Sequence, residues 1–508
     1  MASLVRILAE QARRRPERLA CVVGDDQRTY GELAAEVLRF ACGLRRLGLK
    51  PGDRIGLYVP NSIEYVVAFY GSMRAGLIAN PINSVFTPSE VQYLLADSEA
   101  SAVVSTPELF AGIAGTLDQL KIAHAVTTGS GSERHLAFAD LLAGGDGDLE
   151  FVDDSAAACL PYSSGTTGYP KGIIHTHDSL TAQAIQSADH LQMRPHDTIV
   201  EALPLVHLYP GNIIMGGVIV AGAGLIVQPR FDPPAFVELM GRYRVTACAG
   251  VPTTYAMLCQ VPEQRVAAAD LGSLEVAYSA GAPLPSRIRS EFRRLYGVRV
   301  LDCYGITEAA GNLTAMLRYG DAPELSCGLP YPRTDIRIVD LDDNDVPEGE
   351  VGELIARGPQ IMSGYWNRSK DTEVTLRGGY LHTGDLARRD EDGFYFIVDR
   401  KKDMIIVGGY NVYPAELENV IQSHPAVGMC AVFGVPDEVK GEKPWAAVVP
   451  KAGATVDPAD LEQHCRRSLA AYKVPRRFIV VDELPKSSVG KILRRQLRDQ
   501  YAAQASDH

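Results

Sequence analysis

The chain has 508 residues, a hydrophobic share of 46% and a formal net charge of −12. This length exceeds what one hydrophobic core organises, so we expect a large body and a smaller unit. The acidic balance disfavours a general nucleic-acid binder, which shows a basic field to the phosphate backbone. The nine scattered cysteines contain no C-x-x-C pair, so neither a disulfide framework nor a zinc site is predicted, and reduced cytoplasmic thiols are the simplest interpretation.

Two apolar stretches raise the question of a membrane. Leu4, Ile7 and Leu8 have helical spacing, which predicts an amphipathic surface helix rather than a signal peptide. Residues 202–229 carry no formal charge, but prolines and glycines interrupt them and no run of about 18 apolar residues occurs. We therefore predict buried helix and strand there, not a membrane span.

The alternation of patterns along the chain predicts the fold. Strand-like residues 54–59 and 101–105 flank a helical pattern at 63–73, which is βαβ material and implies parallel sheets. From about residue 334, strands with tight turns predict a small β-rich subdomain. Further on, a helix opened by Pro414 begins a last unit of strands and helices. The predicted fold class is α/β: a large N-terminal domain of βαβ subdomains plus a small β-rich subdomain, followed by a small α+β C-terminal domain.

The decapeptide 163–172, SSGTTGYPKG, is the most informative segment. Glycines there permit positive φ and let backbone N–H groups converge on anionic oxygens, while hydroxyls and one ammonium add donors and charge. The loop is not a Walker A motif, because Pro170 precedes the lysine and Gly172 follows it. A flexible Ser/Gly-rich connector is the alternative. The predicted phosphate-binding residues are Ser163, Ser164, Gly165, Thr166, Thr167, Gly168 and Lys171.

Five further motifs occur at 278–284 (YSAGAPL), 304–308 (YGITE), 380–385 (YLHTGD), 399–403 (DRKKD) and 485–491 (PKSSVGK). Together with the loop, they resemble the adenylate-forming (acyl-activating) enzyme superfamily over nearly the whole chain, in its branch of acyl-CoA synthetases and fatty-acid or aryl-acid CoA ligases. The resemblance implies domains at 1–401 and 402–508, with a mobile C-terminal domain hinged at Lys402. It also implies ATP, Mg²⁺ and coenzyme A as cofactors.

The resemblance assigns roles in holding the nucleotide. Tyr304 stacks on adenine, Thr307 offers a hydroxyl toward the α-phosphate, and Glu308 is an oxygen ligand for Mg²⁺. Asp385 accepts both ribose hydroxyls, and Arg400 also reaches the ribose. For an arbitrary Asp or Arg, a solvated surface charge is the commoner situation. The other implied nucleotide contacts are Gly281, Ala282, Pro283, Asp302 and Gly305.

Lys491 is the main catalytic candidate, beside Thr307 and Glu308. A point charge on a long stem can bridge the attacking carboxylate and the α-phosphate, where charge develops most. The resemblance places residues 408–410 (Gly408, Gly409 and Tyr410) against the pantetheine arm, and a tight strand turn is the alternative. It also places His207 at a gate beside the acyl tunnel, and a core histidine bonded to a backbone carbonyl is the alternative.

The motifs predict an AMP-forming acyl-CoA synthetase, which makes an acyl-adenylate and then a thioester. Its predicted partners are a small-molecule carboxylic acid, ATP and CoA, with no nucleic acid. The neutral segment 211–216 disfavours an amino acid, and the pocket segments favour an apolar, bulky or aromatic acid. An acyl-adenylate ligase that loads a carrier protein is the second interpretation, and luciferase-like oxygenation stays open. A non-catalytic nucleotide-binding protein is the alternative from another class. The sequence indicates no oligomeric state.

Overall fold

The computed structural model of the protein describes residues 2–145, 147, 149–163, 170–437, 440–486 and 492–502. The chain divides into two compact units, Met1–Ile336 with Ala356–Leu381, and Arg337–Ile355 with His382–His508. The predicted domains instead place residues 337–355 and 382–401 with the N-terminal part. The boundary and the hinge at Lys402 therefore stay predictions.

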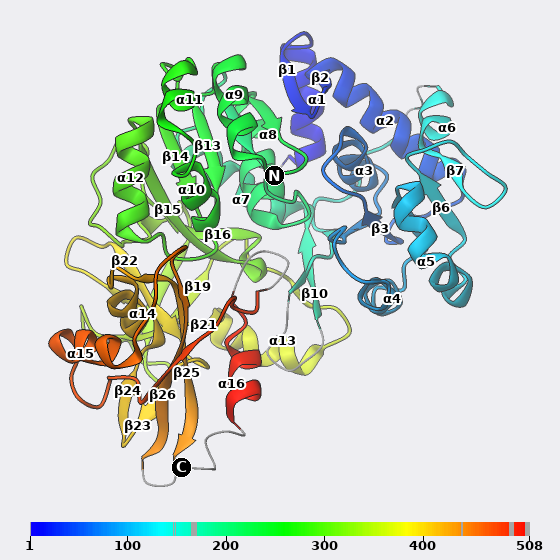
Figure 1. The fold of residues 1–508 in the computed structure, drawn as a ribbon. Helices are drawn as coiled ribbons and strands as arrows, with labels where there is room; N and C mark the ends of the chain where they lie inside the picture. Colours follow the sequence, from blue (N-terminus) through cyan, green and yellow to red (C-terminus); the bar gives the residue numbers. More distant parts are fainter. Residues whose placement is uncertain are drawn as a thin grey trace. The chain divides into compact units, whose positions relative to one another are not determined.

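The first unit contains a nine-stranded sheet whose central strands are parallel (Figure 1). Its order is β17-β16-β15-β14-β13-β11-β12-β1-β2, and all adjacent pairs from β15 to β1 are parallel. The central strands are short, apolar and buried on both faces, as expected where helices cover both sides. The strands are β1 (Leu19–Val23), β2 (Asp26–Thr29), β11 (Thr198–Glu201), β12 (Gly224–Val227), β13 (Ala247–Gly250), β14 (Val276–Ser279), β15 (Arg299–Ile306), β16 (Gly311–Ala315) and β17 (Leu329–Pro330).

A second nine-stranded sheet lies in the same unit, in the order β20-β10-β8-β4-β3-β5-β6-β7, with β9 paired to β10. The predicted strand, helix and strand at 54–59, 63–73 and 101–105 are confirmed as β3, α3 and β5. The strands are β3 (Arg54–Tyr58), β4 (Ile78–Pro81), β5 (Ala102–Ser105), β6 (His124–Thr127), β7 (Leu136–Ala137), β8 (Ala157–Cys159), β9 (Tyr162–Ser163), β10 (Lys171–Thr176) and β20 (Gly364–Tyr365).

Helices cover both faces of each sheet in this unit. One core joins α1, α2, α3, α7 and α8 to one face of each sheet, while α9 to α12 cover the other face of the first sheet and α4 and α5 that of the second. The helices are α1 (Leu4–Arg14), α2 (Tyr30–Arg46), α3 (Ile63–Arg74), α4 (Pro88–Asp97), α5 (Pro107–Leu120), α6 (Phe138–Ala143), α7 (His177–His190), η1 (Tyr209–Ile214), α8 (Met215–Ala221), α9 (Pro233–Arg242), α10 (Pro252–Leu258), α11 (Glu263–Ala268), α12 (Ser286–Tyr296), η2 (Thr307–Ala309), α13 (Ser369–Thr375) and η3 (Arg377–Gly379).

The second unit holds most of the four-stranded sheet β18-β19-β21-β22 and all of a five-stranded sheet, β24-β23-β26-β25 with β27 on β26. The predicted helix at Pro414 is confirmed as α14, with proline in its first turn. The elements are β18 (Asp335–Val339), β19 (Gly352–Arg357), β21 (Leu381–Arg389), β22 (Tyr395–Arg400), β23 (Ile405–Val407), β24 (Tyr410–Val412), α14 (Pro414–Gln422), β25 (Val427–Asp437), β26 (Gly441–Pro450), α15 (Pro458–Ser468), β27 (Arg477–Val480) and α16 (Arg494–Ala502).

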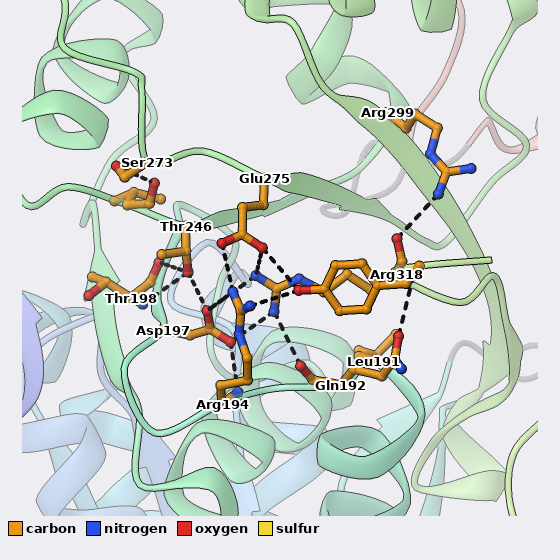
Figure 2. A network of polar contacts seen from close by, with 12 residues as sticks. Leu191, Gln192, Arg194, Asp197, Thr198, Thr246, Ser273, Glu275, Arg299 and Arg318 are labelled. Carbon is orange, nitrogen blue, oxygen red and sulfur yellow. Dashed lines mark hydrogen bonds and ion pairs between the residues drawn. The ribbon is translucent and has the colours of Figure 1, made fainter. Parts of the chain in front are cut away.

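An ion network built around the buried pair of Asp197 and Arg318 fixes the amino ends of β11 and β14 (Figure 2). Asp197, just before β11, accepts bonds from Arg318 at 2.8 and 3.2 Å, from Arg194 and from the Thr246 hydroxyl. Glu275, just before β14, binds both arginines. Every oxygen of Asp197 therefore has partners, and the network stabilises the edge of the sheet opposite to the strands' carboxyl ends.

Two findings concern the whole chain. Among the described residues, no helix combines the length and the apolar character that crossing a membrane requires. All nine cysteines are free thiols, and eight of them are buried.

Candidate active site

The ends of the predicted phosphate loop lie side by side on two paired strands. Ser163 ends β9 and faces Lys171, the first residue of β10, in an antiparallel pair. Tyr93 donates a hydrogen bond to the Pro170 carbonyl at 2.9 Å, which fixes the second end of the loop. The structure thus brings Ser163 and Lys171 together. The other predicted loop residues, Ser164, Gly165, Thr166, Thr167 and Gly168, lie outside the described residues.

Lys171 and Glu308 are connected through Tyr365. The Lys171 ammonium lies 2.8 Å from an Asp371 carboxylate oxygen and 5.1 Å from the centroid of the Tyr365 ring. The Tyr365 hydroxyl donates to Glu308 Oε1 at 3.0 Å. Burial and then the Glu308 charge raise the pKa of Tyr365, so its hydroxyl stays a donor. The loop lysine and the predicted metal ligand therefore belong to one cluster.

The turn that carries Thr307 and Glu308 is fixed by backbone contacts that the sequence did not reveal. Buried His175, on β10, contacts the Thr307 carbonyl through Nε2 at 2.8 Å. Burial lowers the pKa of His175 to about 4, so the ring is neutral and donates this bond. Met362 N–H donates to the Glu308 carbonyl at 2.8 Å. Neither contact residue stands in a charge or spacing pattern, so only the fold identifies them.

Tyr304 and Gly305 lie at the carboxyl end of β15, where parallel strands of α/β folds place their ligands. A Cβ added to Gly305 would come within 1.9 Å of the Gly311 carbonyl on β16, so glycine is required there by the close strand pairing. Gly281, with φ of +84°, and its exposed neighbours 282–283 (Ala282 and Pro283) follow the adjacent strand β14. All these predicted nucleotide contacts share one edge of the sheet.

Asp302 already has a partner in the protein. Its carboxylate binds Arg289 on α12, and its second oxygen, Oδ1, has no hydrogen-bond partner among the described residues. Burial raises the pKa of Asp302 to about 6, although Arg289 opposes the rise. A direct role with the nucleotide stays a prediction, and the Arg289 pair gives this residue a structural role as well.

His207 follows β11 in a loop at the same edge of the sheet. Its Nε2 lies 3.4 Å from the Asn83 side-chain amide nitrogen. This polar contact is thus with a side chain rather than with a backbone carbonyl. Burial lowers the pKa of His207 to about 4, so the ring is neutral. Two residues further on, Tyr209 donates its hydroxyl to the Tyr278 carbonyl at 3.0 Å. The gate role of His207 stays a prediction.

In the second unit, the two predicted ribose contacts are cross-strand neighbours. Asp385 on β21 pairs with Arg400 on β22, and Arg400 Nε lies 3.4 Å from Asp385 Oδ1. Glu353, which the sequence did not single out, accepts from Gly384 N–H at 3.1 Å and from the Lys401 ammonium at 2.9 Å. Glu353 thus fixes the turn that presents Asp385, while Lys402 is exposed.

Gly408 and Gly409 form the two-residue turn between β23 and β24. Their φ values of 60° and 86° fit the hairpin turns that require positive φ at both central residues. Both are exposed, and an added Cβ would meet no atom within 4 Å. The exposed Tyr410 ring stacks on Tyr472 at 4.8 Å. The turn explanation therefore holds, and a role with pantetheine stays a prediction. Lys491 lies outside the described residues.

The residues present fit Mg²⁺ only as a companion of ATP. No group of three His, Cys, Asp or Glu residues in the described part of the chain could hold a metal ion. Mg²⁺ is usually bound by one or two carboxylates plus substrate phosphates and water. Glu308 supplies one such carboxylate, and Tyr365 links it to Lys171. The donor set is therefore suited to a nucleotide-bound Mg²⁺.

These features define an enzyme that gathers anionic groups at the carboxyl edge of a parallel sheet. Residues 8–366 match the model of the AMP-binding enzyme family, and residues 416–491 match that of the AMP-binding enzyme C-terminal domain. The chain belongs to the AMP-binding enzyme family. The predicted superfamily and α/β class are thereby confirmed.

Several relatives are similar to this chain over nearly its full length. A long-chain-fatty-acid–CoA ligase of Yersinia pestis is 36% identical, covering 98% of this chain and 94% of the relative. A feruloyl-CoA synthase of an Amycolatopsis species is 36% identical, covering 97% of each. The ATP-bound structure of MatB from Rhodopseudomonas palustris has a TM-score of 0.91 at 31% identity and covers 99% of both chains. The anthranilate CoA ligase AuaEII, in complex with anthranoyl-AMP, has a TM-score of 0.91 at 30% identity, covering 99% of this chain and 98% of that one.

Proposed function

We propose that this protein activates a monocarboxylic acid with an apolar body and transfers it to coenzyme A. The chain is an AMP-forming acid:CoA ligase, which makes an acyl-adenylate and pyrophosphate, and then a thioester and AMP. The observation that carries the proposal is the cluster of Lys171, Tyr365 and Glu308, which joins the start of β10 to the carboxyl end of β15. A carrier protein as acceptor remains the second candidate, and the cytoplasm is the proposed compartment.

In the first half-reaction, the chain holds ATP and lowers the repulsion between anions. Lys171 and the loop that it closes bind phosphate oxygens, and Tyr304 offers an aromatic face to adenine. Bound at Glu308, Mg²⁺ supplies charge neutralisation at the phosphates. The Thr307 hydroxyl donates toward the α-phosphate, and the neutral His175 ring fixes the turn from which it does so. Lys491 then brings its charge to the attacking carboxylate.

In the second half-reaction, the turn at 408–409 lies along the path of the pantetheine arm. Both glycines are exposed and have open space where a Cβ would stand, which supports an approach by a long flexible thiol. The exposed Tyr410 and Tyr472 rings beside the turn offer an apolar surface to the arm. The reactants have to meet Lys491 in the first half-reaction and residues 408–409 in the second. The C-terminal domain must therefore change its position between the two half-reactions.

The neutral character of the segments 209–215, 251–255 and 309–314 supports an acid without a second carboxylate. Burying an ammonium or a second carboxylate without a partner costs several kcal/mol. Side-by-side kcat/KM values for a medium-chain fatty acid, an aryl acid, malonate and phenylalanine, read as AMP formed with CoA, test the proposal. We expect the fatty acid or the aryl acid to rank first by orders of magnitude. If malonate or phenylalanine ranks first, the proposed acid class is wrong.

A pair of variants tests the two half-reactions separately. Lys491→Ala should lower pyrophosphate release by orders of magnitude and spare thioester formation from supplied acyl-adenylate. Gly409→Leu should spare pyrophosphate exchange and lose transfer to CoA, because the side chain obstructs the thiol. Gly409→Asn is the matched control for backbone strain, since asparagine tolerates positive φ. Equal loss of both steps in either variant contradicts its assigned role.

A further inference from the structure

Glu201 is a buried carboxyl group that the proposed reaction does not use. It is the last residue of β11, its exposed fraction is 0%, and neither carboxylate oxygen has a hydrogen-bond partner among the described residues. Burial raises the pKa of Glu201 well above its usual range. Buried polar groups in proteins are normally hydrogen-bonded, so an orphan carboxyl group needs an explanation.

The contrast with Asp197 shows that this fold satisfies its structural carboxylates. Asp197 precedes the same strand and is also 0% exposed, yet two arginines, a hydroxyl and a backbone N–H all donate to it. Within the described part of the chain, Glu201, four residues later, has none of these partners. Its position at the carboxyl end of a parallel strand is where such folds bind ligands. A substrate group is therefore its expected partner.

The side chain of Glu201 lies on the face of the first sheet that packs against η1. This turn begins two residues after His207, the predicted acid gate. Glu201 shares a pleat face with Ile199 and is level with Val227, and both neighbours belong to the core that contains η1, α7 and α8. Tyr209, two residues after His207, lies close enough for the Glu201 charge to contribute to its raised pKa, behind burial and Cys303. Buried Asn212, also on η1, has an acceptor, Oδ1, with no hydrogen-bond partner in the part of the chain that the structure describes.

The distance across the sheet sets the length of the acid. Two strands, β13 and β14, separate β11 from β15, and the predicted nucleotide contacts lie at the carboxyl end of β15. At the usual strand spacing this is about 14 Å. An acid held at the Thr307 turn reaches Glu201 only if its body is extended or aromatic. Short acids such as acetate cannot touch this carboxyl group.

We infer that Glu201 is a specificity-determining residue that receives a hydroxyl group at the far end of the acid, an inference that rests on the proposed function. A hydroxyl group satisfies Glu201 in either protonation state, because it both donates and accepts. When Glu201 is protonated and donates to the hydroxyl oxygen, the single hydroxyl hydrogen is left for the Asn212 acceptor. The substrate class is thus an acid with an apolar body and a distal hydroxyl group.

Two matched pairs of acids test the inference: p-hydroxycinnamate against cinnamate, and ω-hydroxydodecanoate against dodecanoate. We expect kcat/KM to favour the hydroxylated member by about tenfold or more in the pair whose length fits, since a site that bonds a hydroxyl group rejects the analogue without it. Glu201→Met should abolish this ratio by loss on the hydroxylated acid alone. Glu201→Gln should retain much of it, because the amide still accepts a hydrogen bond.

The controls separate recognition from folding. Asp197→Asn should lower the thermal midpoint and leave the ratio unchanged, whereas Glu201→Met should raise the midpoint, because an orphan carboxyl group is removed from the core. The inference is overturned if the wild type prefers the unsubstituted member of both pairs, or if Glu201→Met lowers both members equally. Absence of AMP with every acid would contradict the proposed function itself, and the inference with it.

Discussion

Lys171 is the side chain on which the charge balance of the ATP site depends. Its ammonium contacts Asp371 at 2.8 Å, and its side chain is 15% exposed. In the proposed function, phosphate oxygens of ATP bind the same ammonium, so the Asp371 carboxylate would compete with the nucleotide. The Tyr365 ring lies 5.1 Å from the Lys171 ammonium, and its hydroxyl donates to Glu308. We therefore predict that the Lys171–Asp371 contact lowers the affinity for ATP.

Asp371→Asn should lower KM for ATP. The Asp371 side of this pair is 41% exposed, so we give the pair about 1 kcal/mol or less and expect a decrease of up to about fivefold, measured by pyrophosphate release at saturating acid. Glu373→Gln on the same helix is the matched control, since it removes one exposed negative charge without touching the Lys171 pair. A KM that rises, or an equal decrease in both variants, would show that Asp371 does not compete for Lys171.

Sequence analysis identified the site residues that belong to local motifs. It missed the residues that act through tertiary contacts. Lys171, Glu308 and the Asp385–Arg400 pair stand in recognisable strings. Lys171 begins β10, Glu308 follows the end of β15, and Arg400 ends β22 opposite Asp385. Glu201 and His175 stand in no such string. Their significance depends on burial and on partners more than a hundred residues away, or on the lack of partners, which no local pattern encodes.

At the scale of elements, the first sheet has two edges with opposite construction. The network of Arg194, Asp197, Glu275 and Arg318 closes the amino edge, whereas the carboxyl edge ends in Gly/Pro turns and carries the orphan Glu201. Short apolar runs predicted β3 and β5 of the second sheet correctly. The ion network could not be predicted, because its members come from three separate segments of the chain.

Arg318→Met should destabilise the first unit strongly. It leaves the buried Asp197 carboxylate without its bidentate partner, and breaking a buried pair costs about 3–5 kcal/mol. We expect a clear drop in the urea midpoint of unfolding. Arg299→Met is the matched control, because Arg299 is more exposed and its contact to Asp321 is long, at 3.7 Å. Similar midpoints for the two variants would contradict a stabilising role of the network.

At the scale of the whole molecule, the question is where the chain bends between the two half-reactions. Backbone contacts group the β-rich segments 337–355 and 382–401 with the C-terminal residues, whereas the family resemblance sets the hinge at Lys402. Contacts in one conformation report which residues pack together. They do not report which dihedral angles change, so the two descriptions answer different questions.

Lys402→Pro tests the hinge. Proline fixes φ near −65°, which hinders rotation at this residue while leaving each unit folded. We expect pyrophosphate release to stay within a few-fold of the wild type and thioester formation to fall by about tenfold or more, as loss of one conformational step implies. Unchanged rates in both steps would move the hinge elsewhere, with the division at 381/382 as the next position to test.

The two acids that flank β11 also give folding two proton linkages of opposite sign. Burial raises the pKa of Asp197, but bonds from Arg318 and Arg194 outweigh it and hold the pKa at about 2. Folding therefore releases a proton there below about pH 4, and that stabilisation is lost as the pH falls toward 2. The raised pKa of Glu201 makes folding take up a proton above about pH 4, and the stability that depends on it declines as the pH rises. The combined contribution of Asp197 and Glu201 to the free energy of unfolding is therefore largest near the pH at which unfolded carboxylates titrate.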